Sequence, residues 1–139
     1  MKLAIIGHGF VGKAVDYGFP DIMCEKYIID PKLNTAIDTL TSVDIDFSFV
    51  CVPTPMGSGG SIDSSIIEDV VSFLKRNVSG TIIIKSTVTP DIILKLFRGP
   101  HRDRIVYNPE FLTEKSANED FVNPFIDRKS TRLNSSHRL

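Results

Sequence analysis

Short apolar runs alternate with longer amphipathic segments along this chain. The runs KLAIIG, EKYIID, FSFVCV, TIIIK and RIVY are rich in isoleucine, valine and phenylalanine, and glycine or proline closes the first three. Runs of this length and composition are typical of short buried strands. The pattern therefore predicts strands over residues 2–7, 25–30, 47–52, 81–85 and 104–107.

Helical spacing fills the intervals between these runs. From Ile66 to Leu74 the apolar residues recur three or four positions apart, with charged residues between them, which predicts an amphipathic helix over residues 63–78. Two further helices are predicted over residues 10–17 and 90–98. Strands that alternate with helices favour a parallel sheet that is covered on both faces.

We therefore expect an α/β fold, a Rossmann-type doubly wound parallel sheet that is incomplete. Residues 32–46 are weakly patterned, and IDTL at 37–40 fits either one turn of helix or a short edge strand. The Gly/Ser-rich stretch at 56–61 predicts a flexible loop.

Composition narrows the class of protein. The 139 residues are 42% hydrophobic and 24% charged, enough for one domain with a buried core. No apolar run has the length of a membrane-spanning helix, and the N-terminus lacks a signal-peptide cleavage pattern, so we expect a cytoplasmic protein without a membrane partner. Cys24 and Cys51 form no CxxC pair, which argues against a disulfide scaffold and a zinc site.

The C-terminal residues differ from the rest of the chain. Residues 127–139 hold four Lys or Arg and one Asp, whereas the preceding residues are acidic overall, which gives no reason to expect a nucleic-acid partner. DRKSTRLNSSH at 127–137 matches, codon for codon, the in-frame translation of a common sequencing-adapter oligonucleotide. We expect residues 1–126 to form the domain and residues 127–139 to be a non-native tail, with the gene truncated near residue 126; a natural basic tail is the alternative.

A glycine-rich turn is the first sign of chemistry. GHGFVG at residues 7–12 follows a predicted strand and opens a predicted helix, the context in which GxGxxG binds a dinucleotide. Gly7 permits the tight turn, Gly9 lets a pyrophosphate approach the backbone, and Gly12 lets the helix pack on the strand. Free N–H groups at the helix start, at Phe10 and Val11, would then face the phosphates.

An acidic residue follows at the spacing that this motif requires. Asp30 ends the second predicted strand, eighteen residues after Gly12, where it can accept hydrogen bonds from ribose hydroxyls and repel a 2′-phosphate. This predicts NAD rather than NADP as the cofactor, and Lys32 is the nearby cation that would weaken the preference. His8, at a variable position of the turn, is interpreted as a tolerated exposed side chain rather than a catalytic base.

Three more motifs follow predicted strands: VCVPTP (50–55), KSTVTP (85–90) and NPEFLTEKSA (108–117). The carboxyl ends of parallel strands are where open α/β sheets bind ligands. Together with GHGFVG and GGSIDSSIIEDVV, these motifs resemble the NAD-binding domain of the UDP-glucose/GDP-mannose dehydrogenase family, over residues 1–125.

The resemblance implies an enzyme that oxidises the C6 alcohol of a nucleotide-sugar to the uronic acid with two NAD. UDP-glucose, giving UDP-glucuronate, is the substrate we expect. GDP-mannose or an N-acetylated UDP-sugar is an alternative within the family. A dinucleotide-binding module without catalysis is the alternative outside it.

The resemblance also implies roles for residues of the two strand-end motifs. Thr54, Ser86 and Thr87 match positions that line the nicotinamide and sugar side of the cleft, and Thr87 matches a threonine that helps to hold a catalytic water. From the residues alone, Thr54 and Thr87 fit ordinary turn chemistry at strand ends.

The last motif carries the remaining implied roles. Glu110 and Glu114 match the family's paired acids near the reacting carbon, where Glu114 would assist acid–base steps. Phe111 and Leu112 match a segment that grips the nucleotide-sugar. Without the resemblance, the two glutamates fit a solvated helix start.

The chain departs from the family pattern in two ways. The family's nucleophilic cysteine, and the central helix on which its homodimer is largely built, have no counterpart here, and neither Cys24 nor Cys51 matches. No covalent thiohemiacetal could then form, so we expect the 139-residue chain to be inactive alone. The stretch between Asp30 and Phe47 is also short, so we expect the family's third strand and the helix before it to be reduced.

Overall fold

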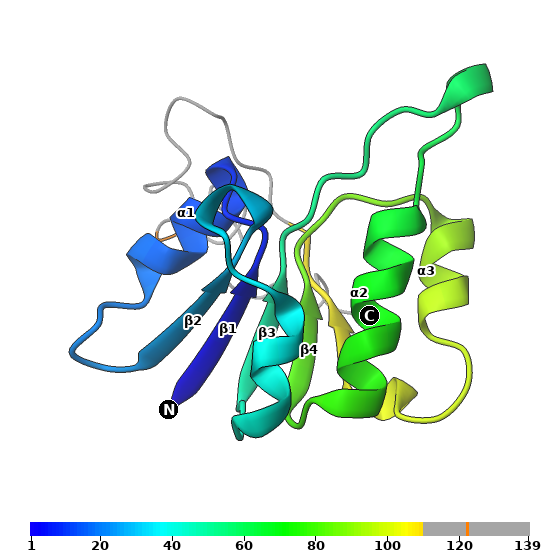
Figure 1. The fold of residues 1–139 in the computed structure, drawn as a ribbon. Helices are drawn as coiled ribbons and strands as arrows, with labels where there is room; N and C mark the ends of the chain where they lie inside the picture. Colours follow the sequence, from blue (N-terminus) through cyan, green and yellow to red (C-terminus); the bar gives the residue numbers. More distant parts are fainter. Residues whose placement is uncertain (110–121, 123–139) are drawn as a thin grey trace, which may run out of the picture.

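The computed structural model describes residues 1–109 and 122. Its centre is a parallel sheet with the strand order β2-β1-β3-β4-β5 (Figure 1). The strands are β1 (Lys2–Ile6), β2 (Glu25–Ile29), β3 (Phe47–Val50), β4 (Thr81–Ile84) and β5 (Ile105–Tyr107). All five predicted strands are therefore confirmed, and each is one or two residues shorter than its apolar run.

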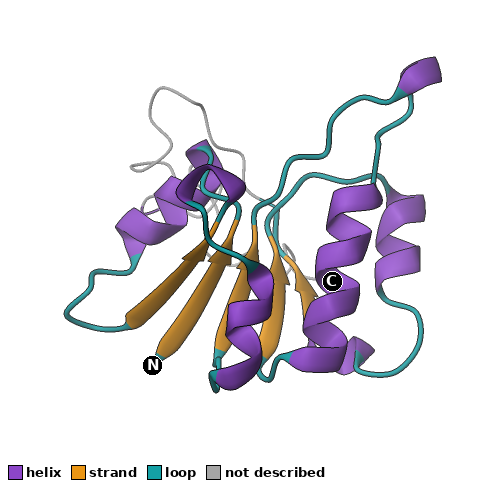
Figure 2. Cartoon of the chain, viewed as in Figure 1, coloured by secondary structure: helices purple, strands orange, loops and turns teal. Residues whose placement is uncertain are grey.

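Helices cover both faces of this sheet. They are α1 (Phe10–Gly18), α2 (Ser65–Asn77) and α3 (Pro90–Leu96), and Figure 2 shows the strands between α1 on one side and α2 and α3 on the other. Because side chains alternate along a strand, Leu3 and Ile5 of β1 pack with Val15 of α1, whereas Ala4 and Ile6 join the larger core beneath α2 and α3. The doubly wound α/β fold is thus confirmed.

The connections reverse direction between β1 and β3. From β1 the chain crosses through α1 to β2 at one edge, and β3, α2, β4, α3 and β5 then build the sheet in the opposite direction. Such a switch point leaves a crevice at the carboxyl ends of the two central strands, and open α/β sheets bind their ligands in that crevice.

The segment between β2 and β3 has no strand. It forms two 3₁₀ helices, η1 (Pro31–Leu33) and η2 (Ile37–Ser42), so β2 is an edge of the described sheet. Of the two alternatives for residues 37–40, the helical one is correct. The reduced third strand is also confirmed, and the fully buried Leu40 of η2 anchors the short connection in the core.

The Gly/Ser-rich stretch after β3 forms a largely exposed loop with a short turn at its tip. Met56 and Ile62 form an antiparallel bridge around a 3₁₀ turn, η3 (Ser58–Gly60), and the Gly57 N–H donates to the Ser61 carbonyl at 2.6 Å. Figure 1 shows this arm projecting beyond α2. Within the described residues, no helix combines the length and the apolar character needed to cross a membrane.

Candidate nucleotide-binding site

A cavity of about 940 Å³ opens at the switch point between β1 and β3. Its walls come from the glycine-rich turn, the end of β2, the 3₁₀ segment after it, and the loops that follow β3 and β4. Most of the predicted cofactor residues that the structure describes line it: Gly7, Gly9, Phe10, Val11, Asp30, Thr54, Ser86 and Thr87. Gly12 is the exception.

The three glycines of the turn have different surroundings. Gly7 has a φ of +96°, and a Cβ on it would lie 2.5 Å from the Cys51 carbonyl oxygen of the strand-end next to it. A Cβ on Gly12 would overlap the Gly7 carbonyl, so Gly12 serves the packing of α1 on the turn. A Cβ on Gly9 would meet no protein atom within 4 Å, so the space beside Gly9 is open.

Helix α1 begins at this open space. Its N-cap is Gly9, which has no side chain to accept a hydrogen bond from the first turn. The first N–H groups of any helix lack partners within the helix, and the dipole makes that end positive. The start of α1 therefore offers free donors and a partial positive charge to an anion in the cavity.

Asp30 stands at the end of β2, on the cavity wall. Its Oδ2 accepts the His8 N–H at 2.7 Å, and its Oδ1 accepts the Lys32 N–H at 2.8 Å. The His8 and Lys32 hydrogen bonds hold the pKa of Asp30 below its usual range. The carboxylate is thus charged, joined to the glycine-rich turn, and still able to accept further hydrogen bonds on its remaining lone pairs.

The loops after β3 and β4 are joined by two hydroxyl groups. Ser86 is buried, and its Oγ donates to the Val52 carbonyl at 2.7 Å. Thr54 Oγ1 donates to the Thr87 carbonyl at 3.0 Å. The hydroxyl protons of Ser86 and Thr54 therefore join the two loops to each other. The hydroxyl oxygens can still accept hydrogen bonds from other groups.

Lys85 also lines the cavity, and the sequence analysis did not single it out. Its side chain is only 5% exposed, and its Nζ donates to Asn108 Oδ1 at 3.1 Å. This contact links the end of β4 to the residue that follows β5. One feature of the sequence could have pointed to Lys85: it directly follows three isoleucines, where a buried strand would continue with another apolar residue.

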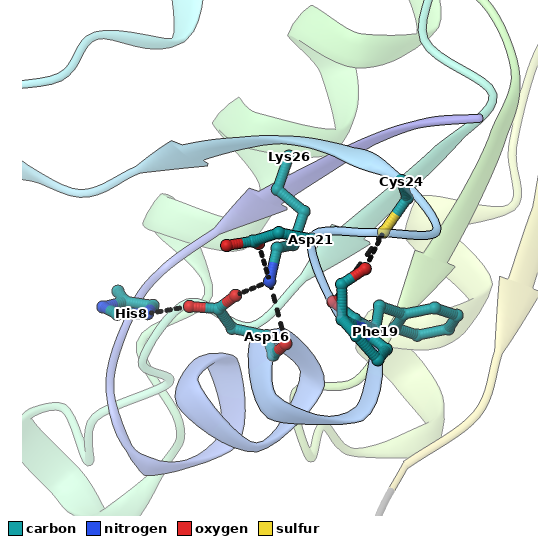
Figure 3. A network of polar contacts seen from close by, with 7 residues as sticks. His8, Asp16, Phe19, Asp21, Cys24 and Lys26 are labelled. Atoms are coloured by element: carbon teal, nitrogen blue, oxygen red, sulfur yellow. Dashed lines mark hydrogen bonds and ion pairs between the residues drawn. The ribbon is translucent and has the colours of Figure 1, made fainter.

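His8 is not the exposed side chain that its position suggested. The side chain is 19% exposed, and Nε2 lies 3.2 Å from Asp16 Oδ2 of α1 (Figure 3). Asp16 in turn pairs with Lys26 of β2, whose Nζ also contacts Asp21 at 2.8 Å and the Asp16 carbonyl at 3.1 Å. The turn, α1 and β2 are thus connected by one polar network.

Asp16 and Lys26 in this network each stabilise the charged form of the other. Burial alone would raise the pKa of Asp16, but the hydrogen bonds from Lys26 and His8 outweigh it and hold that pKa below its usual value. Burial alone would lower the pKa of Lys26, and the contacts with Asp16 and Asp21 raise it instead. Asp16 and Lys26 therefore both stay charged through the neutral range.

Known proteins agree with this arrangement. A model of the NAD-binding domain of the UDP-glucose/GDP-mannose dehydrogenase family matches residues 20–128. The chain belongs to this family. The resemblance inferred from the motifs is confirmed, and NAD is confirmed as the cofactor of this domain type.

This chain corresponds to less than half of the length of individual dehydrogenases of the family. UDP-glucose 6-dehydrogenase AglM of Haloferax volcanii is 26% identical over an alignment of 171 positions. The alignment covers 89% of this chain and 39% of that protein. The UDP-glucose 6-dehydrogenase of Streptococcus pneumoniae is also 26% identical, over 155 residues, with the same coverage. The chain thus spans 39% of the length of these dehydrogenases.

A solved structure of the family has the same fold. The UDP-glucose dehydrogenase from Pyrobaculum islandicum superimposes with a TM-score of 0.66 at 22% identity, over 88% of this chain and 39% of that one. At this level of identity the likeness concerns the fold alone, and it agrees with the Rossmann-type sheet described above.

The residues of the turn fit the cofactor of the dehydrogenase family. The open space beside Gly9 and the uncapped start of α1 suit a pyrophosphate, and the charged Asp30 carboxylate suits ribose hydroxyls. Within the described residues, no group of three or more His, Cys, Asp or Glu could hold a metal ion.

The part of the predicted site that holds the two glutamates lies outside the described residues. Glu110, Phe111, Leu112 and Glu114 belong to this part, so their implied roles stay predictions. The chain that leads to them is placed: the Asn108 N–H donates to the Ile84 carbonyl at 3.0 Å, at the same sheet edge as Ser86 and Thr87.

Proposed function

We propose that this chain is the NAD-binding portion of a nucleotide-sugar dehydrogenase that oxidises the C6 alcohol of UDP-glucose to UDP-glucuronate with two NAD. The observation that carries the proposal is the shared cavity, because the glycine-rich turn, Asp30 and the Thr54–Thr87 loops all line it. The name UDP-glucose 6-dehydrogenase, borne by relatives from two organisms, supports UDP-glucose as the substrate. GDP-mannose and N-acetylated UDP-sugars are the alternatives that the test must include.

NAD, when bound, accepts a hydride from the alcohol carbon. The residues of this chain bind and orient the reactants. The start of α1 would hold the pyrophosphate, Asp30 would accept the ribose hydroxyls, and the joined loops at Thr54 and Thr87 would border the nicotinamide and the sugar. In the same proposal, Thr87 positions a water molecule.

The segment after β5 supplies the rest of the proposed chemistry. Glu110 and Glu114 would act as acid and base near the reacting carbon, and Phe111 and Leu112 would contact the nucleotide-sugar. Lys85, through its hydrogen bond with Asn108, fixes the point from which this segment leaves the sheet.

The test is a chimera in which residues 1–126 replace the matching part of the Haloferax volcanii relative. We expect NADH to form with UDP-glucose, and more slowly or not at all with GDP-mannose and UDP-N-acetylglucosamine. The same chimera with Gly9→Val is the control and should be inactive. A chimera that folds and binds NADH but oxidises no nucleotide-sugar would contradict the proposal and favour the non-catalytic module. Preference for another sugar would overturn UDP-glucose alone.

A further inference from the structure

Asp30 is the first residue after β2, at an edge of the sheet. Within the described residues no strand pairs with β2 on its outer side, because the chain continues directly into the 3₁₀ helix η1. On that side, the main chain of Asp30 is therefore held by the turn that follows it and not by a neighbouring strand. The partners that the turn provides decide how firmly the Asp30 side chain is placed at the cavity.

Thr35 holds Asp30 through its hydroxyl group. The Thr35 Oγ1 accepts the Asp30 N–H at 2.8 Å and donates to the Asp30 carbonyl oxygen at 3.3 Å. One side chain, five residues later in the chain, thus binds both polar groups of the Asp30 main chain. Thr35 is exposed and lines the cavity, so the contact lies at the site itself and not in the core.

The residues between Asp30 and Thr35 make this contact possible. Pro31, with its fixed φ, begins η1. Asn34 ends η1 with a left-handed φ of 55°, which Asn adopts more readily than most residues, and its N–H donates to the Pro31 carbonyl at 3.1 Å. The chain therefore turns back at Asn34 and brings the Thr35 hydroxyl against the Asp30 main chain.

The exact position of the Asp30 carboxylate matters differently for the two nicotinamide cofactors. Hydrogen bonds from ribose hydroxyls require a narrow range of distance and angle, and they weaken steeply outside it. The repulsion of a 2′-phosphate depends on charge and falls only gradually with distance. A displaced carboxylate would therefore bind NAD less well while it still repels NADP.

We propose that Thr35 is a positioning residue that sets the preference of this site for NAD over NADP, by holding Asp30 in place for the ribose hydroxyls. The inference rests on the cofactor-binding role of Asp30 in the proposed function. Thr35 leaves the charge of Asp30 unchanged, so its hydroxyl controls the favourable hydrogen bonds to NAD and not the repulsion of NADP.

The test is calorimetric titration of the full 139-residue chain with NADH and with NADPH. Thr35→Val keeps the shape of the side chain and removes the hydroxyl. We expect its NADH affinity to decrease about threefold to tenfold, the size expected for the loss of a hydrogen bond, and its NADPH affinity to decrease less. Thr35→Ser keeps the hydroxyl and should restore the wild-type ratio. Thr39→Val is the matched control, because Thr39 is exposed and its Oγ1 donates within η2, to the Ala36 carbonyl at 2.7 Å.

A double-mutant cycle shows whether Thr35 acts through Asp30, and it requires NADH alone. In the Asp30→Asn background, Thr35→Val should decrease NADH affinity less than it does in wild type, because the carboxylate that Thr35 positions is already absent. Equal effects in the two backgrounds would refute the proposal. Thr35→Ala repeats the loss of the hydroxyl with a smaller side chain, so a folding defect caused by valine alone does not decide the result.

The outcomes separate the role of Thr35 from that of Asp30. If Asp30→Asn narrows the ratio of NADH to NADPH affinity but Thr35→Val and Thr35→Ala do not, Asp30 keeps its role and the role of Thr35 is overturned. Equal weakening of both cofactors in the Thr35 variants, or unfolding of both variants, would mean a structural role and would also overturn it. A wild-type chain that binds no NADH, or an unchanged ratio in Asp30→Asn, would overturn both assignments.

Discussion

The hydroxyl of Thr54 donates a hydrogen bond to the main-chain carbonyl of Thr87, 3.0 Å away and thirty-three residues later in the chain. The bond joins the loops after β3 and β4 on the wall of the cavity. Ser86 makes a second link between the same loops, to the Val52 carbonyl. The two motifs VPTP and KSTV are therefore one structural unit at the site.

Replacing Thr54 by valine should loosen this unit. The change removes the donor but keeps the shape, so we expect the free energy of unfolding to decrease by about 0.5–1.5 kcal/mol. NADH affinity should decrease severalfold, because the loop that borders the cavity is released. Thr54→Ser keeps the hydroxyl and serves as the control. Urea denaturation and calorimetric titration measure the two effects, and equal NADH affinity in Thr54→Val and wild type would contradict the expectation.

Substitutions at two glycines of the turn should differ in their effects on NADH binding and on folding. In Gly9→Val the new side chain enters open space, so the fold should persist with a stability change within about 1 kcal/mol while NADH binding is lost. In Gly12→Val the new side chain meets the Gly7 carbonyl, so the domain should be strongly destabilised. Circular dichroism and NADH titration of both variants test the contrast. A folded Gly9→Val that binds NADH tightly would show that the pyrophosphate lies elsewhere.

Much of this site follows from local sequence order. A GxGxxG between a strand and a helix allows few backbone paths, so the positions of Gly7, Gly9 and Gly12 could be predicted without knowing the tertiary structure. Asp30 could be placed because it ends the next strand, which pairs with the first. The same reasoning located the Thr54 and Thr87 loops at one edge of the sheet.

Contacts between elements could not be predicted in this way. The pairing of Asp16 with Lys26 depends on how α1 docks on β2, and no periodicity in the sequence encodes that angle. The orientation of His8 follows from this docking, and so does the Lys85–Asn108 contact from the pairing of β4 with β5. Residues 37–40 were ambiguous because four residues are too few to distinguish a helical from a strand period.

The Asp16–Lys26 pair should stabilise the domain over a definite pH range. The lowered pKa of Asp16 means that its contribution is present at neutral pH and is lost as the pH falls through that pKa, below about 4. The raised pKa of Lys26 means that its contribution is lost only when the pH rises above the ordinary lysine value, about 10.4.

Lys26→Met should therefore lower the free energy of unfolding by about 1–2 kcal/mol at neutral pH, because hydrogen bonds between charged groups are lost at a largely buried position. The difference from wild type should shrink below about pH 4, where Asp16 takes up a proton. Lys13→Met is the control, since Lys13 is exposed on the same helix that carries Asp16. Urea melts of the variants at neutral and acidic pH measure the change. An equal loss at both pH values would mean that packing, rather than the ion pair, accounts for it.

The tail from residue 127 should make no contribution to stability. If residues 127–139 are translated adapter, deleting them should leave the melting temperature unchanged within about 1 °C. Arg104→Met shows that the measurement is sensitive, because the Arg104 guanidinium donates to the Leu74, Val78 and Gly80 carbonyls where α2 ends, and its loss should lower the melting temperature by several degrees. A similar decrease on deletion of the tail would favour a natural segment.

Asp30 should decide between the two nicotinamide cofactors. Hydrogen bonds from the His8 and Lys32 N–H groups lower its pKa, so the carboxylate is charged throughout the neutral range and repels a 2′-phosphate. We expect wild type to bind NADH at least about tenfold more tightly than NADPH, as one unfavourable charge contact in a surface site predicts. Asp30→Asn removes the charge and should narrow the difference, whereas Asp38→Asn, at an exposed acid of η2, should leave it unchanged. Calorimetric titration with both cofactors gives the ratios. Equal affinities in wild type would contradict the role of Asp30 in selecting the cofactor.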